Sequence, residues 1–117
     1  MTPVDEYIER LENVHQQHLI FHLHRLIMSF PDISTKLRFK IPFYDGSKWI
    51  CYINPVKKNG VEVCFIKGFQ LTNRPQLEAR NRTMVKGISI YEINDETLAL
   101  IAEVFQEALE LDKNSGA

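Results

Sequence analysis

The spacing of apolar residues changes twice along the chain, and this change constrains the fold more than any other feature of the sequence. Near both ends apolar residues recur every three or four positions, as on one face of a helix, whereas in the middle they alternate as in strands. The first helix begins at Thr2 and Pro3, an N-cap followed by proline at the first helical position, and breaks near Asn13. A second helix with a leucine stripe runs up to SFPDIS, and Asn94 or Asp95 caps a final helix over ETLALIAEVFQEALELD.

Four strands are expected in the middle of the chain. The first covers KLRFKIPFYDG, where Leu37, Phe39 and Ile41 lie on one face and Arg38 and Lys40 on the other. The second is KWICYIN, and the third, GVEVCFIKG, pairs with it as a hairpin across a loop rich in turn residues. After a long segment without a clear period, TMVKGISIYEI is the fourth strand.

The order α-α-β-β-β-β-α predicts an α+β domain, a four-stranded, mainly antiparallel sheet with the helices packed on one face. The other face of the sheet should then be partly open, with Arg38 and Lys40 pointing to it. A chain of 117 residues fits a single domain over residues 1–117, with an ordered core at about 2–112 and a frayed tail at 113–117.

The composition excludes several classes of protein. Hydrophobic residues make up 44% and charged residues 25%, which is typical of a globular domain and not of a disordered chain. No run approaches the ~18 apolar residues of a membrane span, so no membrane partner is expected. The acidic, polar first ten residues do not resemble a signal peptide, and two cysteines are too few for a disulfide scaffold. We therefore expect a cytoplasmic protein with reduced thiols.

Charge is distributed unevenly along the chain, although the net charge is only −1. Residues 1–35 hold two basic and five acidic residues, residues 36–87 hold eleven basic and three acidic, and residues 88–117 hold one basic and seven acidic. Such a chain either neutralises itself across the fold or leaves a basic surface for an anionic partner. The sequence favours the first alternative, because surface charges are usually just solvated.

No catalytic motif is present, so we expect a binding module, not an enzyme, and assign no catalytic residue. The sequence lacks a P-loop, the Gly-x-Gly-x-x-Gly fingerprint, a Gly-x-Ser-x-Gly elbow and a His-Glu-x-x-His zinc motif. Cys51 and Cys64 each lie within a predicted strand, where a free cysteine usually behaves as a small buried hydrophobe.

The candidate binding surface is the open sheet face, where basic and aromatic residues alternate. Its predicted residues are Arg38, Lys40, Tyr44, Trp49, Tyr52 and Lys86. Such a surface binds a small anionic ligand or a protein partner, or serves as a homodimer interface. Single-stranded nucleic acid is a further alternative, against which the net charge of −1 counts. The alternative is that these residues have no binding role. In that interpretation, the aromatic residues belong to the core and the basic residues pair with the acidic helices.

All four histidines lie in the segment VHQQHLIFHLH. On a helical wheel His15, His18 and His22 fall within about 60° of each other, at about 100° per residue. His18 and His22 stand at i, i+4, from where two imidazoles can bind one metal, with Glu12 as the nearest candidate third ligand. We expect solvent-facing imidazoles here and no cofactor, with weak iron binding by helix carboxylates as the alternative.

Several segments resemble the YdhG-like domain family. They are TPVDEYIERL, LHRLIMSFPDISTKLRFKIPFYDGSKWICYINP, VEVCFIKG and RNRTMVKGISI, and the resemblance covers roughly residues 2–112. The family resemblance implies an α+β fold and supplies no catalytic motif. Some members are proposed to act as intracellular iron chaperones with a frataxin-like role, although the histidines here match no family signature.

Overall fold

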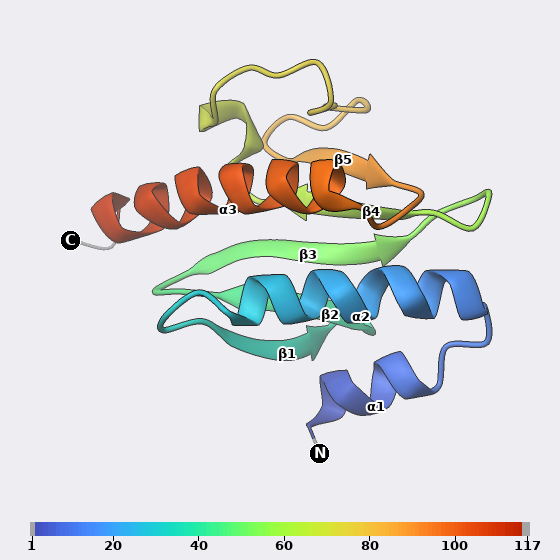
Figure 1. Cartoon of the computed structure of the whole chain (residues 1–117). Helices are drawn as coiled ribbons and strands as arrows, with labels where there is room; N and C mark the ends of the chain where they lie inside the picture. The colour runs from blue at the N-terminus through green and yellow to red at the C-terminus, as the bar shows by residue number, and fades with distance from the viewer. Residues whose placement is uncertain (1, 116–117) are drawn as a thin grey trace.

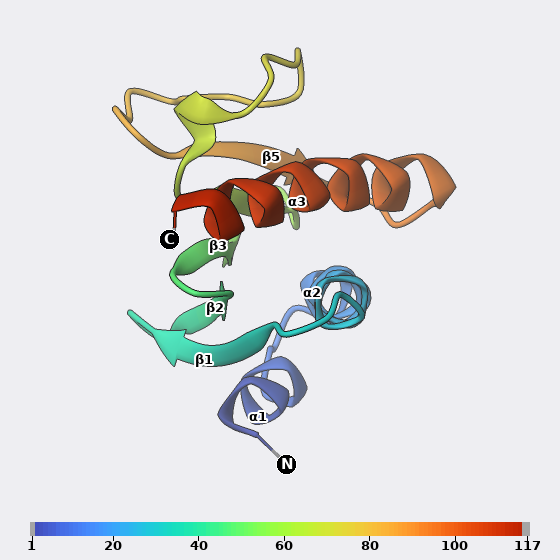
Figure 2. The ribbon, with the colours of Figure 1, turned by 90° about the vertical axis from the view of Figure 1, so that its left-hand side faces the viewer.

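A computed structural model describes residues 2–115. The elements are α1 (Pro3–Glu9), α2 (Val14–Met28), β1 (Ser34–Arg38), β2 (Ile41–Asp45), β3 (Trp49–Pro55), β4 (Val61–Phe65), the 3-10 turn η1 (Gly68–Gln70), β5 (Lys86–Ile90) and α3 (Asp95–Ser115). The strands form one antiparallel sheet in the order β1-β2-β3-β4-β5. The helices lie on one face of this sheet (Figures 1 and 2), so the predicted α+β class is confirmed. No helix within residues 2–115 combines the length and apolarity needed to cross a membrane.

The predicted helix starts are confirmed by their caps. Thr2 and Asp5 form a capping box, in which the Thr2 hydroxyl accepts from the Asp5 N–H and the Asp5 carboxylate accepts from the Thr2 N–H, both at 3.1 Å. The break near Asn13 is present, because the Asn13 side chain accepts from the Gln16 N–H and begins α2. Asn94 caps α3 in the same way through the Thr97 N–H.

The prediction of four strands is wrong, because the first predicted strand is a hairpin. β1 and β2 pair from Ser34↔Asp45 to Arg38↔Ile41, with Phe39 and Lys40 as a two-residue turn. Both turn residues have positive φ, 54° and 66°, which is the signature of a type I′ turn. The sheet therefore has five strands, and the turn reverses the chain where continuous alternation was expected.

The core lies between the sheet and the helices. The strands contribute Tyr44, Cys51, Ile53, Val61, Val63, Phe65, Ile88 and Ile90 to it. The helices contribute the buried side chains of Leu19, Leu23, Ile27, Ile101, Phe105 and Leu109. These side chains share one layer between the sheet and the helices. The alternate side chains of each strand point to the opposite face of the sheet, which we call the outer face.

The end of α3 differs from the expected frayed tail. Helix α3 continues to Ser115, so residues 113–115 are helical, whereas residues 116–117 lie outside the described residues. The buried carboxylate of Asp112 accepts hydrogen bonds from the Ser47 and Lys48 N–H groups at 2.7 and 2.9 Å. This carboxylate fixes the last turns of the helix to the β2–β3 turn, which composition alone does not reveal.

Candidate functional site

Side chains of the outer face follow from the register of the sheet. Phe43, Tyr52 and Cys64 lie directly opposite one another on β2, β3 and β4. In an antiparallel sheet such partners point to the same side, and Phe43 and Cys64 do not belong to the core between sheet and helices. The outer face is therefore not purely polar, and its apolar residues need a separate explanation.

Four rings on the outer face, Phe39, Phe43, Trp49 and Tyr52, form what we call the aromatic cluster. Phe43 stacks on Tyr52 with ring centroids 4.9 Å apart and meets Trp49 edge-on at 5.3 Å. Phe39 lies 5.9 Å from Phe43 and 6.5 Å from Trp49. Phe43 is 3% exposed, whereas Phe39 and Trp49 are 79% and 44% exposed, so a buried ring supports two rings that face solvent.

Arg38 orders one side of this cluster. Its guanidinium donates to both oxygens of the Asp45 carboxylate at 2.8 Å, and its Cζ lies 4.5 Å from the centroid of the Trp49 ring. A two-pronged pair of this kind fixes the guanidinium plane against the indole. Because Asp45 neutralises it, Arg38 positions Trp49 but adds little net charge to the face.

A solvent-open hollow of about 530 Å³ adjoins Trp49 at the β2–β3 turn. Its lining includes Arg38, Asp45, Lys48, Trp49 and Lys67. Arg38 and Asp45 neutralise each other in this lining, Lys48 forms no ion pair with any residue in 2–115, and an exposed indole forms part of the wall. The hollow therefore suits an anion that also presents apolar surface.

The ion pairs decide between the two alternatives for the uneven charge. All four arginines of residues 36–87 pair with carboxylates; only Arg74, through Glu103 and Glu107, reaches a helix, whereas the pairs of Arg38, Arg80 and Arg82 stay within that segment. Three exposed lysines around the aromatic cluster, Lys36, Lys40 and Lys48, form no ion pair with any residue in 2–115. We call them the rim lysines. Neutralisation across the fold is thus incomplete, and it leaves positive charge beside the exposed rings.

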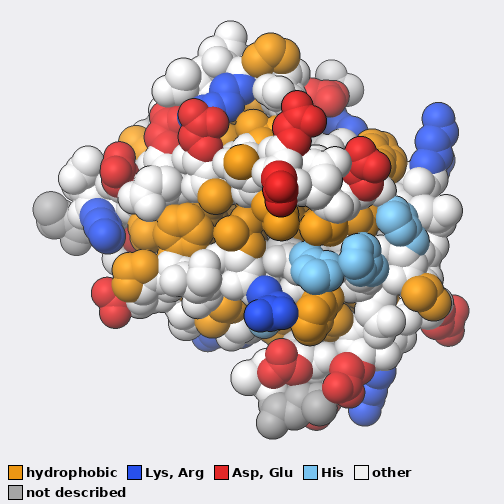
Figure 3. Space-filling model, viewed as in Figure 1, with side chains coloured by type: hydrophobic (Ala, Val, Ile, Leu, Met, Phe, Trp, Pro, Cys, Tyr) orange, Lys and Arg blue, Asp and Glu red, His pale blue; other side chains and the backbone are white. Residues whose placement is uncertain are grey.

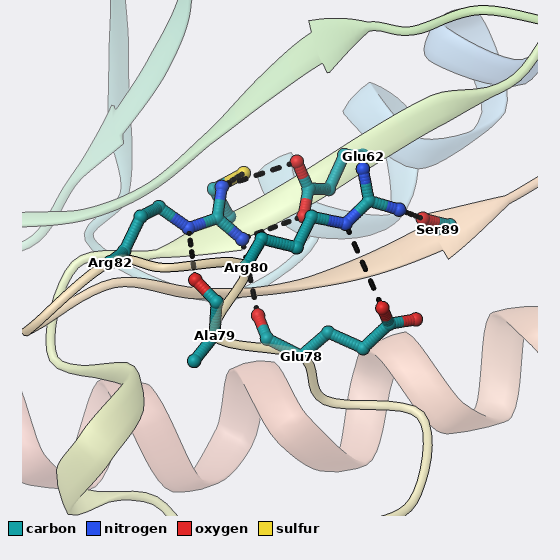
Figure 4. A network of polar contacts seen from close by, with 7 residues as sticks. Glu62, Glu78, Ala79, Arg80, Arg82 and Ser89 are labelled. Carbon is teal, nitrogen blue, oxygen red and sulfur yellow. Dashed lines mark hydrogen bonds and ion pairs between the residues drawn. The ribbon is translucent and has the colours of Figure 1, made fainter.

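The other half of the outer face is closed by the segment between β4 and β5 (Figure 4). Arg82 donates to Glu62 at 2.8 and 3.3 Å, and Arg80 lies 3.6 Å from the same carboxylate. Burial raises the pKa of Glu62, but the Arg82 hydrogen bonds and both arginine charges reverse this, so its pKa is lowered overall. This network holds the segment over β4 and leaves only the β1–β3 half of the face open.

The thiols and phenols near the outer face are not activated for chemistry. Burial, and then the nearby Glu62 charge, raises the pKa of Cys64 to about 12. Burial and the neighbouring Cys64 raise the pKa of Tyr52 to about 12 as well, and burial raises the pKa of the Cys51 thiol, which lies on the core side of the sheet. A group held in its neutral form at physiological pH is a poor nucleophile, so this face suits binding better than covalent chemistry.

The structure brings together only part of the predicted site. Arg38, Trp49 and Tyr52 lie on the outer face as predicted, and Lys40 lies in the turn beside Phe39. Tyr44 is fully buried on the opposite side, because it alternates with Phe43 along β2, and its hydroxyl bonds to His24 Nδ1 at 2.8 Å. Lys86 lies apart at the start of β5, with Nζ 4.7 Å from the Phe69 ring.

The site also includes residues that the prediction omitted. Phe39 was assigned to a strand face with Leu37, and Phe43, Lys36 and Lys48 were left out of the predicted set. Recognising the turn at Phe39 and Lys40 would have placed Phe39 beside Trp49, but the sequence there carries no Asn-Gly or Asp-Gly signal.

His15, His18 and His22 follow one another along α2, and Figure 3 shows a row of histidine side chains on this face of the molecule. The rings of His18 and His22 meet edge-on at 4.6 Å, and His15 Nε2 lies 2.6 Å from the Tyr91 carbonyl oxygen. Within residues 2–115 no three His, Cys, Asp or Glu side chains are arranged to hold a metal ion, so Glu12 completes no such group. The predicted metal alternative therefore has no preformed site among the residues that the structure describes.

The outer face thus offers two exposed rings, a neutralised arginine that orders them and three rim lysines. No protein-family profile matches the chain, and neither a curated protein nor a solved structure matches it. We therefore infer the function from this geometry.

Proposed function

We propose that the protein is a small binding or carrier module, of the kind that the resemblance to YdhG-like domains suggests. Its outer sheet face would bind an anionic partner that also presents a flat, apolar group. One observation carries the proposal, namely that Phe39 and Trp49 are exposed next to lysines that have no ion pair within the described residues.

Physical chemistry favours such a partner over a purely structural role for these residues. Single exposed apolar side chains are common, but exposed rings packed against a buried ring form a preordered apolar patch. Aromatic and arginine side chains most often dominate binding energies, and aromatic side chains in particular lose little conformational entropy on contact. The Arg38–Asp45 pair fixes the indole before any partner arrives, which lowers the ordering cost of binding.

Trp49 is the only tryptophan of the chain, so its fluorescence reports directly on this face. Two probes separate ring from charge: ATP carries an aromatic ring and a triphosphate, and inorganic tripolyphosphate carries the charge alone. We expect ATP to change the emission of Trp49 at lower concentration than tripolyphosphate does. Equal responses to the two probes would mean that the aromatic cluster does not contribute to binding, which contradicts the proposal.

Two pairs of variants test the same face. Phe39→Ser should weaken the ATP response several-fold, whereas Phe21→Ser, at an exposed ring on α2 away from this face, should not. Lys40→Glu should weaken it as well, whereas Lys113→Glu, the same charge change on α3, should leave it intact.

A homodimer is the outcome that would replace this proposal. Sedimentation equilibrium that finds a dimer in the wild-type protein and a monomer in Phe39→Ser would assign the aromatic cluster to a subunit interface. A monomer in both proteins, together with the expected ATP response, supports the binding module.

A further inference from the structure

The rim lysines and the two exposed rings point to a more specific partner. We propose that the outer face binds single-stranded nucleic acid, with unstacked bases against Phe39 and Trp49 and backbone phosphates at Lys36, Lys40 and Lys48. This inference rests on the proposed function of the same face, and it names the class of anion.

The orientation of the rings favours single strands over duplexes. Phe39 and Trp49 lie 6.5 Å apart with ring planes 78° from parallel, and Arg38 already covers one face of the indole. Two neighbouring bases can contact both rings only if they turn away from each other. A flexible single strand allows this, whereas paired and stacked bases in a duplex offer no free faces.

The arrangement of the lysines favours a chain of phosphates over a single anion. Lys36 lies opposite Phe43 on β1, Lys40 lies in the turn beside Phe39, and Lys48 borders the hollow next to Trp49. The three cations thus surround the aromatic cluster and do not converge on one point. A compact anion is usually held by converging donors, often an arginine fork, but every arginine of this region is already paired.

The net charge of −1 does not weigh against this partner, because charge is divided between the two faces. Acidic side chains gather over α3 on the face that the helices cover (Figure 3). The carboxylates near the outer face are those of Asp45, Glu62 and Glu78, and each is paired with an arginine. A nucleic acid approaching the rim lysines therefore meets net positive potential.

An acidic peptide with aromatic side chains shares part of this chemistry. Nucleic acid is favoured because every base presents a flat face, so two differently oriented rings are used without a sequence requirement. The peptide is kept as one outcome of the experiment.

The experiment titrates the full-length protein and follows Trp49 emission. The probes are thymidine monophosphate, an eight-nucleotide oligothymidylate, an eight-base-pair duplex and an octapeptide of alternating Glu and Phe. We expect the oligothymidylate to bind at least about tenfold more tightly than either the monophosphate or the duplex. Three phosphates neutralised on a single strand predict a slope of log affinity against log salt near −2, at about −0.7 for each contact.

Variants test whether the dependence of affinity on salt comes from the rim lysines. Lys40→Gln should reduce the slope by about 0.7, while Lys113→Gln should leave it unchanged. Phe39→Leu should weaken binding several-fold without changing the slope, because it removes stacking but no charge. If all the variants, including Lys113→Gln, change both the affinity and the salt slope in the same way, the cause is a folding defect, which circular dichroism detects. The rim lysines and Phe39 would then not be supported as the binding residues, and the inference would lose its basis.

The outcomes separate this inference from the proposed function. If ATP changes Trp49 emission but the oligothymidylate binds no more tightly than the monophosphate, the inference is wrong and the proposed function stands. The same conclusion applies if the duplex or the acidic octapeptide binds best. If no probe changes Trp49 emission, both are wrong.

Discussion

Arginines and lysines of the sheet region behave differently, and the difference follows from their chemistry. Arg38 and Arg82 each grip a carboxylate with two nitrogens, whereas Lys36, Lys40 and Lys48 remain in solvent. The planar guanidinium matches a carboxylate and is weakly hydrated, whereas an ammonium is a strongly hydrated point charge. The sequence identifies both residue types, but which arginine meets which carboxylate depends on contacts between strands.

The imidazole of His24 lies between two polar groups in a half-buried position, and this makes stability depend on pH. Its Nδ1 bonds to the Tyr44 hydroxyl at 2.8 Å and its Nε2 lies 3.8 Å from the Asp5 carboxylate. Burial lowers the pKa of His24, and the Asp5 charge offsets this only in part. The unfolded chain, with an ordinary histidine pKa of about 6.5, therefore binds this proton more readily than the folded protein.

The free energy of unfolding should accordingly fall as pH drops through about 6.5, and this contribution should level off below the folded pKa of His24. Urea unfolding between pH 8 and pH 5 measures the effect. The variant His24→Gln should flatten the profile, whereas His18→Gln, on the exposed side of the same helix, should keep it. A wild-type profile that rises toward pH 5 would contradict the prediction.

Among the elements, helices were easier to predict than strands. The apolar stripes of α2 and α3 and the caps at Thr2, Asn13 and Asn94 are local patterns, and the structure retains them. The β1–β2 hairpin was missed because apolar alternation continues straight through its turn, at Phe39 and Lys40, where turns usually show Gly or Asn. The same error misplaced Phe39, so a missed turn became a missed site residue.

The turn at Phe39 and Lys40 holds both residues in a left-handed conformation. Lys40 has φ 66°, and a left-handed conformation costs a non-glycine residue roughly 1–2 kcal/mol. Lys40→Gly removes this cost but adds about 0.5–1 kcal/mol of backbone entropy loss, so we expect a gain in stability of roughly 0.5–1 kcal/mol. Urea unfolding measures it, with Lys36→Gly as the matched control, which should lose about 0.5–1 kcal/mol because Lys36 lies within β1. Equal losses in both variants would mean that the turn stores no strain.

For the whole molecule, the sequence does not predict how charge is divided between the two sheet faces, nor that half of the outer face is covered. Counting residues gave three segments of alternating sign, but whether they neutralise one another depends on which face each side chain occupies. The prediction of Arg38, Trp49 and Tyr52 on the open face needed only strand alternation, which is local. The coverage of β4 by Arg82 needed a contact between residues 20 positions apart, and no local pattern announces it.

The two cysteines are covered by different parts of the molecule. Cys51 belongs to the core beneath the helices, whereas Cys64 lies on the outer face beneath Arg82, whose Nη1 lies 3.6 Å from its sulfur. Both thiols are inaccessible in the native state. Exposing Cys51 requires the sheet and helices to separate, but exposing Cys64 requires only the segment between β4 and β5 to lift.

Cys64 should therefore react with a disulfide reagent faster than Cys51 under native conditions, as measured in the single-thiol variants Cys51→Ser and Cys64→Ser. Arg82→Ala leaves the buried Glu62 poorly paired, at a local cost of roughly 1–3 kcal/mol, since Arg80 retains part of the interaction. This change should speed the labelling of Cys64 about tenfold and leave Cys51 nearly unaffected. Lys57→Ala, an exposed substitution in the β3–β4 loop, serves as the control and should change neither rate. If both thiols instead react at one rate with one urea dependence, the outer segment and the core open together, because exposure then requires unfolding of the whole domain.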